Sequence, residues 1–108
     1  MRAERRRAPR YPFIAMAEIT DEMENARTSS QVSDLSQHGC YVEMMNPFPY
    51  GTNVLIEIYT ETEFLETHAT VARFEPKHGM ELTFDEIPPH FASVLSKWLR
   101  QAEGRKAS

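Results

Sequence analysis

The side chains best suited to binding an anionic ligand lie at the start of the chain. Residues 1–10 contain five arginines and one glutamate, a formal charge of +4, and the rest of the chain carries −8. Arg6 and Arg10 are four residues apart, and Arg5 and Arg7 stand on either side of Arg6. A guanidinium makes paired hydrogen bonds to phosphate and to guanine edges, and it stacks on planar rings. This segment therefore predicts a phosphate- or guanine-binding end, whereas the acidic remainder is unsuited to DNA or RNA.

A second group of polar residues falls within residues 34–39. Asp34 accepts hydrogen bonds only, so it can receive guanine N–H groups or orient an arginine, whereas Ser36 can donate to phosphate or accept. Gly39 predicts either a positive φ or a point where a ligand approaches the backbone closely. Asp34 and Ser36 can instead satisfy their own backbone within a turn, and the two roles can coexist. We expect His38 to be a turn residue only.

These two groups resemble the two signature motifs of the PilZ family. Residues 6–10, Arg-Arg-Ala-Pro-Arg, are similar to RxxxR, and residues 34–39, Asp-Leu-Ser-Gln-His-Gly, are similar to [D/N]xSxxG. The order matches the family, and the likeness covers nearly the whole chain because Tyr11-Pro12, residues 79–84 and the C-terminal helical pattern also resemble its layout. The resemblance implies an all-β fold, a six-stranded antiparallel PilZ-like β-barrel with one C-terminal α-helix, that binds the bacterial second messenger cyclic di-GMP.

The resemblance also implies which residues bind the ligand. Arg6 and Arg10 would be the main ligand arginines, and a basic residue at position 5 implies a mode in which two stacked ligand molecules bind. Arg73 lies in a predicted strand and could line the same face, which the sequence leaves open. The full set of implied ligand residues is Arg5, Arg6, Arg7, Arg10, Asp34, Ser36 and Gly39.

The elements that must position these residues are predicted from hydrophobic periodicity. Alternating or β-branched runs predict six strands with short connections and no helix between them, which favours antiparallel pairing. After Pro88-Pro89, apolar residues recur at helical spacing from Phe91 to Leu99, with Trp98 in the core-facing stripe. We expect residues 1–12 to be a flexible arginine-rich arm, residues 13–102 the barrel with its closing helix, and residues 103–108 a disordered tail. The strands are predicted at 13–20, 31–34, 40–44, 54–59, 65–74 and 80–84.

Composition excludes several other classes of protein. The 108 residues suffice for one domain, and the single cysteine, Cys40, excludes an internal disulfide. No apolar run is long enough for a membrane-spanning helix, and the arginine-rich start lacks the apolar stretch of a signal peptide, so we expect a cytoplasmic protein. The four histidines lack paired ligand spacing, and no nucleophile and base are recognisable. We therefore expect neither a metal nor a cofactor, and no enzyme activity.

The leading hypothesis is a single-domain sensor and adaptor for cyclic di-GMP. Binding would order the arginine arm against the barrel and so signal to an unidentified downstream protein in trans. The alternative is a PilZ-fold protein–protein adaptor with little or no nucleotide binding.

Overall fold

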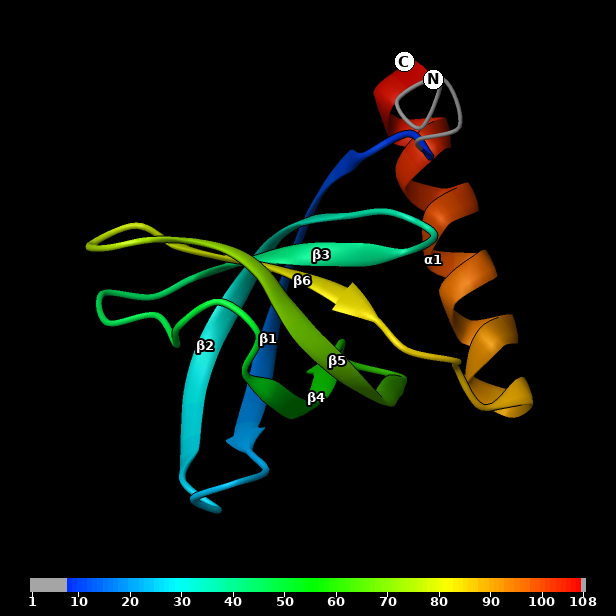
Figure 1. Ribbon diagram of the computed structural model, residues 1–108. Coiled ribbons are helices and arrows are strands. Elements are labelled where there is room, and N and C mark those ends of the chain that lie inside the picture. The colour runs from blue at the N-terminus through cyan, green and yellow to red at the C-terminus, as the bar shows by residue number, and fades with distance from the viewer. Residues whose placement is uncertain (1–7, 108) are drawn as a thin grey trace, which may run out of the picture.

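The computed structural model describes residues 8–107, with side chains as far as Gly104 (Figure 1). This part of the chain contains six strands followed by one helix, as the sequence predicts. The connections between consecutive strands contain three to nine residues, the longest being residues 44–52, and the helix comes last. The elements are β1 Tyr11–Asp21, β2 Arg27–Leu35, β3 Gly39–Glu43, β4 Asn53–Tyr59, β5 Phe64–Glu75, β6 Gly79–Phe84 and α1 Pro89–Ala107.

The strands close into a barrel in the order β1-β2-β3-β6-β5-β4, and every neighbouring pair is antiparallel. The barrel closes because β1 pairs with β4 as well as with β2. Side chains along each strand alternate between the interior and the outer face, as the two-residue period of a strand requires. The interior is filled mainly by Val, Ile and Leu, including Ile19, Ile56 and Val71, all with no exposed surface. The predicted fold class, an antiparallel barrel with a C-terminal helix, is confirmed.

The first hairpin is longer than the sequence predicts. We expected residues 21–30 to form a loop or a frayed hairpin, and the structure has a hairpin in which β2 begins at Arg27 and pairs with β1 as far as Thr20. The start of this strand has no hydrophobic pattern because its residues are polar. Its outward side chains make hydrogen bonds across the sheet, such as the one that Ser29 Oγ donates to Glu18 Oε2 at 2.6 Å. The turn itself is short and contains Asn25 at φ 59°. β1 likewise starts at Tyr11, so two residues assigned to the flexible arm belong to the barrel.

The helix α1 packs against one side of the barrel, on β1 and β5 (Figure 1). Trp98 anchors it: the side chain is 1% exposed, its ring centroid lies 5.3 Å from that of Phe13, and its indole N–H donates to Glu63 Oε1 at 3.2 Å. Lys97 donates to the other oxygen of Glu63. The prediction that Trp98 belongs to the core is confirmed. The helix continues to Ala107, five residues beyond the end that the sequence predicts, because Gly104 does not interrupt it.

Candidate ligand-binding site

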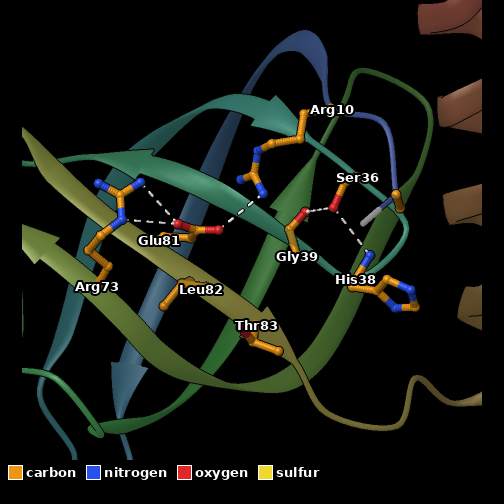
Figure 2. Close-up of a pocket in the computed structure, with 9 residues that line it drawn as sticks. Arg10, Ser36, His38, Gly39, Arg73, Glu81, Leu82 and Thr83 are labelled. Atoms are coloured by element: carbon orange, nitrogen blue, oxygen red, sulfur yellow. Dashed lines mark hydrogen bonds and ion pairs between the residues drawn. The ribbon is translucent and has the colours of Figure 1, made fainter. Parts of the chain in front are cut away.

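A cavity of about 470 Å³ opens where the start of β1, the β2–β3 turn and the middle of β5 and β6 meet (Figure 2). Three of the residues predicted from the motifs, Arg10, Ser36 and Gly39, lie on its wall. A volume in this range is typical of small-molecule sites. Its lining residues are Ala8, Arg10, Ser36, His38, Gly39, Arg73, Glu81, Leu82 and Thr83.

Arg10 is the residue that joins the two motifs. It precedes β1, and its guanidinium donates to Asp34 Oδ1 at 2.9 Å and to Glu81 Oε2 at 3.1 Å. The Arg10 side chain is 31% exposed, so it is held in place yet remains accessible from the cavity. Two fixed acceptors orient the planar guanidinium, which suits it to a paired interaction with a phosphate or a guanine edge.

Asp34 contributes by orienting Arg10 rather than by lining the cavity. It lies near the end of β2, where the pairing with β1 shifts between Pro12 and Ala15 and the pairing with β3 shifts between Val32 and Asp34. Such irregularities add a residue to one strand and redirect its side chains. Of the two roles the sequence left open for Asp34, orientation of an arginine is the one observed. Asp34 itself borders a separate depression, together with Tyr41 and Glu75.

The turn at residues 36–39 is held by Ser36 and by the strand across from it. Ser36 N–H donates to the Gly39 carbonyl at 2.8 Å, and Ser36 Oγ accepts from the His38 N–H at 3.2 Å. The side chain therefore serves the turn, the alternative role that the sequence left open. The His38 carbonyl accepts from Phe84 N–H at 2.8 Å, which ties the turn to the end of β6. His38 also lines the cavity, so the expectation of a turn residue only was incomplete.

Gly39 is required by strand packing. Its φ is not in the positive range, so that explanation is wrong. A Cβ at this position would lie 2.1 Å from the backbone oxygen of Leu82 and 3.1 Å from its carbonyl carbon. Gly39 pairs with Thr83, and only a residue without a side chain lets β3 approach β6 so closely. A neighbouring strand makes one close approach at Gly39, and the approach of a ligand there stays a prediction.

Two cavity residues extend the site beyond the motifs. Arg73 and Glu81 are direct partners in the β5–β6 pairing, and the Arg73 guanidinium donates to Glu81 Oε1 at 3.1 Å (Figure 2). Glu81 therefore bridges Arg73 and Arg10. A shift in pairing between Val71 and Arg73 turns Arg73 outward onto this face. The sequence raised Arg73 only as an open question and missed Glu81, although its place between the core residues Met80 and Leu82 marked it as outward-facing.

The described ionic groups of the site form one chain of contacts with a surplus of negative charge. Arg73 also donates to Glu75 Oε2 at 2.8 Å, and Glu75 accepts the Tyr41 hydroxyl at 2.6 Å. Burial and this bond raise the pKa of Tyr41 to about 12, and the same bond lowers the pKa of Glu75. Glu81 raises the pKa of Arg73. The network's two arginines, at 10 and 73, face three carboxylates, at 34, 75 and 81, a formal charge of −1.

Arg5, Arg6 and Arg7 lie outside the described residues, so the first arginine of the first motif has no position here. Among residues 8–107, no group of three or more His, Cys, Asp or Glu side chains is placed to hold a metal ion. None of the helical segments that the structure describes is both long and apolar enough to cross a membrane.

Comparison with known protein families decides the identity of this domain. The family model described as "PilZ domain" matches residues 4–101, a range that contains both motifs and every strand. This chain belongs to the PilZ domain family. The resemblance inferred from the two motifs is confirmed. A search of curated protein sequences finds no match.

Several solved structures share the fold. The PilZ domain with c-di-GMP of YcgR from Escherichia coli superposes with a TM-score of 0.76 at 17% identity, covering 95% of this chain and 94% of that one. The Bacillus subtilis inhibitor of motility, MotI/DgrA, gives a TM-score of 0.80 at 22% identity and covers all of this chain but 56% of its own. The PilZ domain of CeSA from a cellulose-synthesizing bacterium gives 0.68 at 20% identity, covering 92% of this chain and 99% of that one.

Proposed function

We propose that this chain binds cyclic di-GMP in the cavity beside Arg10 and acts as a sensor or adaptor without catalytic activity. The observation that carries the proposal is the contact between the two motifs. The Arg10 guanidinium of RxxxR donates to Asp34 Oδ1 of [D/N]xSxxG at 2.9 Å, and Arg10 lines a cavity together with Ser36 and Gly39. A similar PilZ domain, that of YcgR, was solved with c-di-GMP.

The charge of the site supports a role for the arginine arm in binding. Cyclic di-GMP carries a charge of roughly −2, one per phosphodiester. The described network is itself negative by one unit, so the charges of Arg10 and Arg73 are already balanced by carboxylates of the barrel. Arg5, Arg6 and Arg7 would bring the total to +2, which matches the ligand. Binding therefore depends on residues from both halves of the site, the arm and the barrel.

The output of the sensor follows from this division of the site. The negative phosphates of the ligand would attract the arginines of the arm and Arg10 at the barrel at the same time. Binding would then change the surface formed by the first residues of the chain, and a partner protein can respond to that change. Arg5 is the residue on which a second, stacked ligand molecule would depend. We propose Arg73 as an additional ligand arginine, because its side chain is 58% exposed and faces the same cavity as Arg10.

Isothermal titration calorimetry of the full chain with cyclic di-GMP tests the proposal. We expect micromolar or tighter binding, weak or no binding of GMP, and a stoichiometry of one or two that falls to one in Arg5→Ala if the ligand binds as a stacked pair. The Arg5→Ala/Arg6→Ala/Arg7→Ala variant should lose binding while keeping its melting temperature. Wild-type protein that gives no binding heat would disprove nucleotide sensing and leave the adaptor without nucleotide binding as the function.

A further inference from the structure

The outer face of the barrel carries an apolar row that crosses three strands. Met16 of β1 pairs with Tyr59 of β4, and Tyr59 pairs with Phe64 of β5. All three point outward, and Met16 and Phe64 are 56% and 45% exposed. Ile14 at one end, 68% exposed, borders the same depression as Met16 and Tyr59, and Phe91 of α1 continues the row beyond Phe64, with ring centroids 5.4 Å apart.

An acidic row runs beside the apolar one. Glu18 of β1 pairs with Glu57 of β4, which pairs with Glu66 of β5. These glutamates are two residues further along the same strands, so the two rows are about 7 Å apart on one face. We call the two rows together the Met16 surface. Arg27 donates to Glu18 and Glu57, but Glu66 has no ion pair among the described side chains.

The acidic row leaves this face with a net negative charge. One arginine, Arg27, pairs with two of its three carboxylates, which leaves a formal charge of −2. Exposed Met and aromatic side chains in contact with one another are typical of protein interfaces. A sheet face that holds an exposed apolar row beside a row of net negative charge is therefore suited to a partner that covers the first and neutralises the second.

The geometry of this face selects the kind of partner. Met16, Tyr59 and Phe64 lie where β1, β4 and β5 are paired with one another, so an added strand finds no free edge at these three residues. Neighbouring strands are about 4.8 Å apart, and side chains three or four residues apart on a helix are about 5–6 Å apart. The apolar side chains along a helix laid across the strands would therefore have nearly the same spacing as the side chains of the apolar row. Anionic lipid and nucleic acid would be repelled by the acidic row.

We infer that the Met16 surface binds an amphipathic helix of a partner protein, one that carries a row of Lys or Arg beside its apolar stripe. None of its residues borders the cavity at Arg10, so the inference stands whether or not the cavity binds a nucleotide. The surface lies on the barrel wall, where β1, β4 and β5 pair.

Nuclear magnetic resonance titration of the isotopically labelled full chain tests the inference. The probe is an amidated helical peptide of about 18 residues, long enough to hold a helix, with a Leu stripe flanked on one side by Lys. A second peptide has Glu in place of each Lys. We expect the Lys peptide to shift amide signals at residues 16–18, 57–59 and 64–66, and salt to weaken its binding because exposed charges are screened. The Glu peptide should bind more weakly.

Matched variants separate this surface from nonspecific apolar binding. Met16→Ser/Phe64→Ser should lower the affinity for the Lys peptide by at least about tenfold, the effect of losing two interface contacts. Met45→Ser/Tyr50→Ser removes an exposed methionine and an exposed aromatic side chain elsewhere, each more exposed than its counterpart in the Met16 surface, and should change nothing. Glu66→Lys should reverse the preference between the two peptides. The inference is overturned if both peptides bind alike, if shifts fall elsewhere or do not occur, if phosphatidylglycerol vesicles bind this face, or if the chain itself dimerises through it.

Discussion

Replacement of Arg10 by alanine should separate ligand binding from fold stability, and the chain contains a matched control. Arg10 donates to Asp34 and Glu81, from two different strands. Arg27 makes the same kind of bridge to two glutamates on the other side of the barrel, away from the cavity. Each variant therefore removes one guanidinium and two ion pairs, but only Arg10→Ala removes a group from the proposed site.

The expected effects follow from the exposure of the two arginines. Arg10 is 31% exposed and Arg27 is 62% exposed, so solvent screens both sets of ion pairs and each pair contributes at most about 1 kcal/mol to stability. Both variants should stay folded. Loss of a charged, paired hydrogen-bond donor to the ligand should cost Arg10→Ala roughly 2–4 kcal/mol of binding free energy, or about 30- to 1000-fold in Kd.

Calorimetry with cyclic di-GMP on the wild type and both variants, with melting temperatures measured in parallel, provides the assay. We expect Arg27→Ala to bind within about twofold of the wild type, since exposed surface charges away from a site change affinity little. Equal losses in the two variants would mean that general charge, and not the site at Arg10, governs binding. Wild-type affinity in Arg10→Ala would refute the assignment of this arginine.

Further variants test the packing and electrostatics around the site. Gly39→Ala should lower the free energy of unfolding by about 1–3 kcal/mol in denaturant, because the new Cβ meets the β6 backbone. Gly104→Ala is the control and should be neutral or stabilising, because nothing lies within 4 Å of its new Cβ. Equal losses in the two variants would contradict the strand-packing role of Gly39. Trp98→Ala should cost about 3–5 kcal/mol, and a loss under 1 kcal/mol would show that α1 does not close the core. Tyr41→Phe should raise the pKa of Glu75 toward 4.5 in carboxyl NMR titrations. Because that pKa is depressed in the folded protein, the stability Glu75 contributes is present above 4.5 and lost as pH falls through the folded value, so the variant should lose less stability in acid.

The barrel was implied by the resemblance to the PilZ family. Periodicity was sufficient to predict its six strands and the helix, because the strands bury alternate residues and the helix buries its own stripe. Periodicity failed where hydrogen bonds between polar side chains, and not burial of apolar ones, hold two strands together. Residues 27–30 are polar, yet they belong to β2 because their outward side chains bond to β1. No hydrophobic pattern marks such a segment as a strand.

The site was partly predictable for a related reason. The two motifs could be found because their residues are close in sequence, and the Arg10–Asp34 contact follows from the pairing of β1 with β2. Glu81 and Arg73 reach the cavity through the pairing of β3 with β6 and of β6 with β5, which joins segments far apart in the sequence. The reason for Gly39 was also beyond the sequence, because it depends on how closely another strand approaches.

The most direct test of nucleotide binding between the arm and the barrel is an NMR shift map of the full chain with cyclic di-GMP. We expect ligand-induced shifts at Arg10, at residues 36–39, at Arg73 and Glu81, and at residues 5–7, with the Met16 surface unchanged. Shifts confined to residues 1–10 would mean that the arm binds the ligand without the barrel. No shifts at saturating ligand would contradict the proposed site altogether.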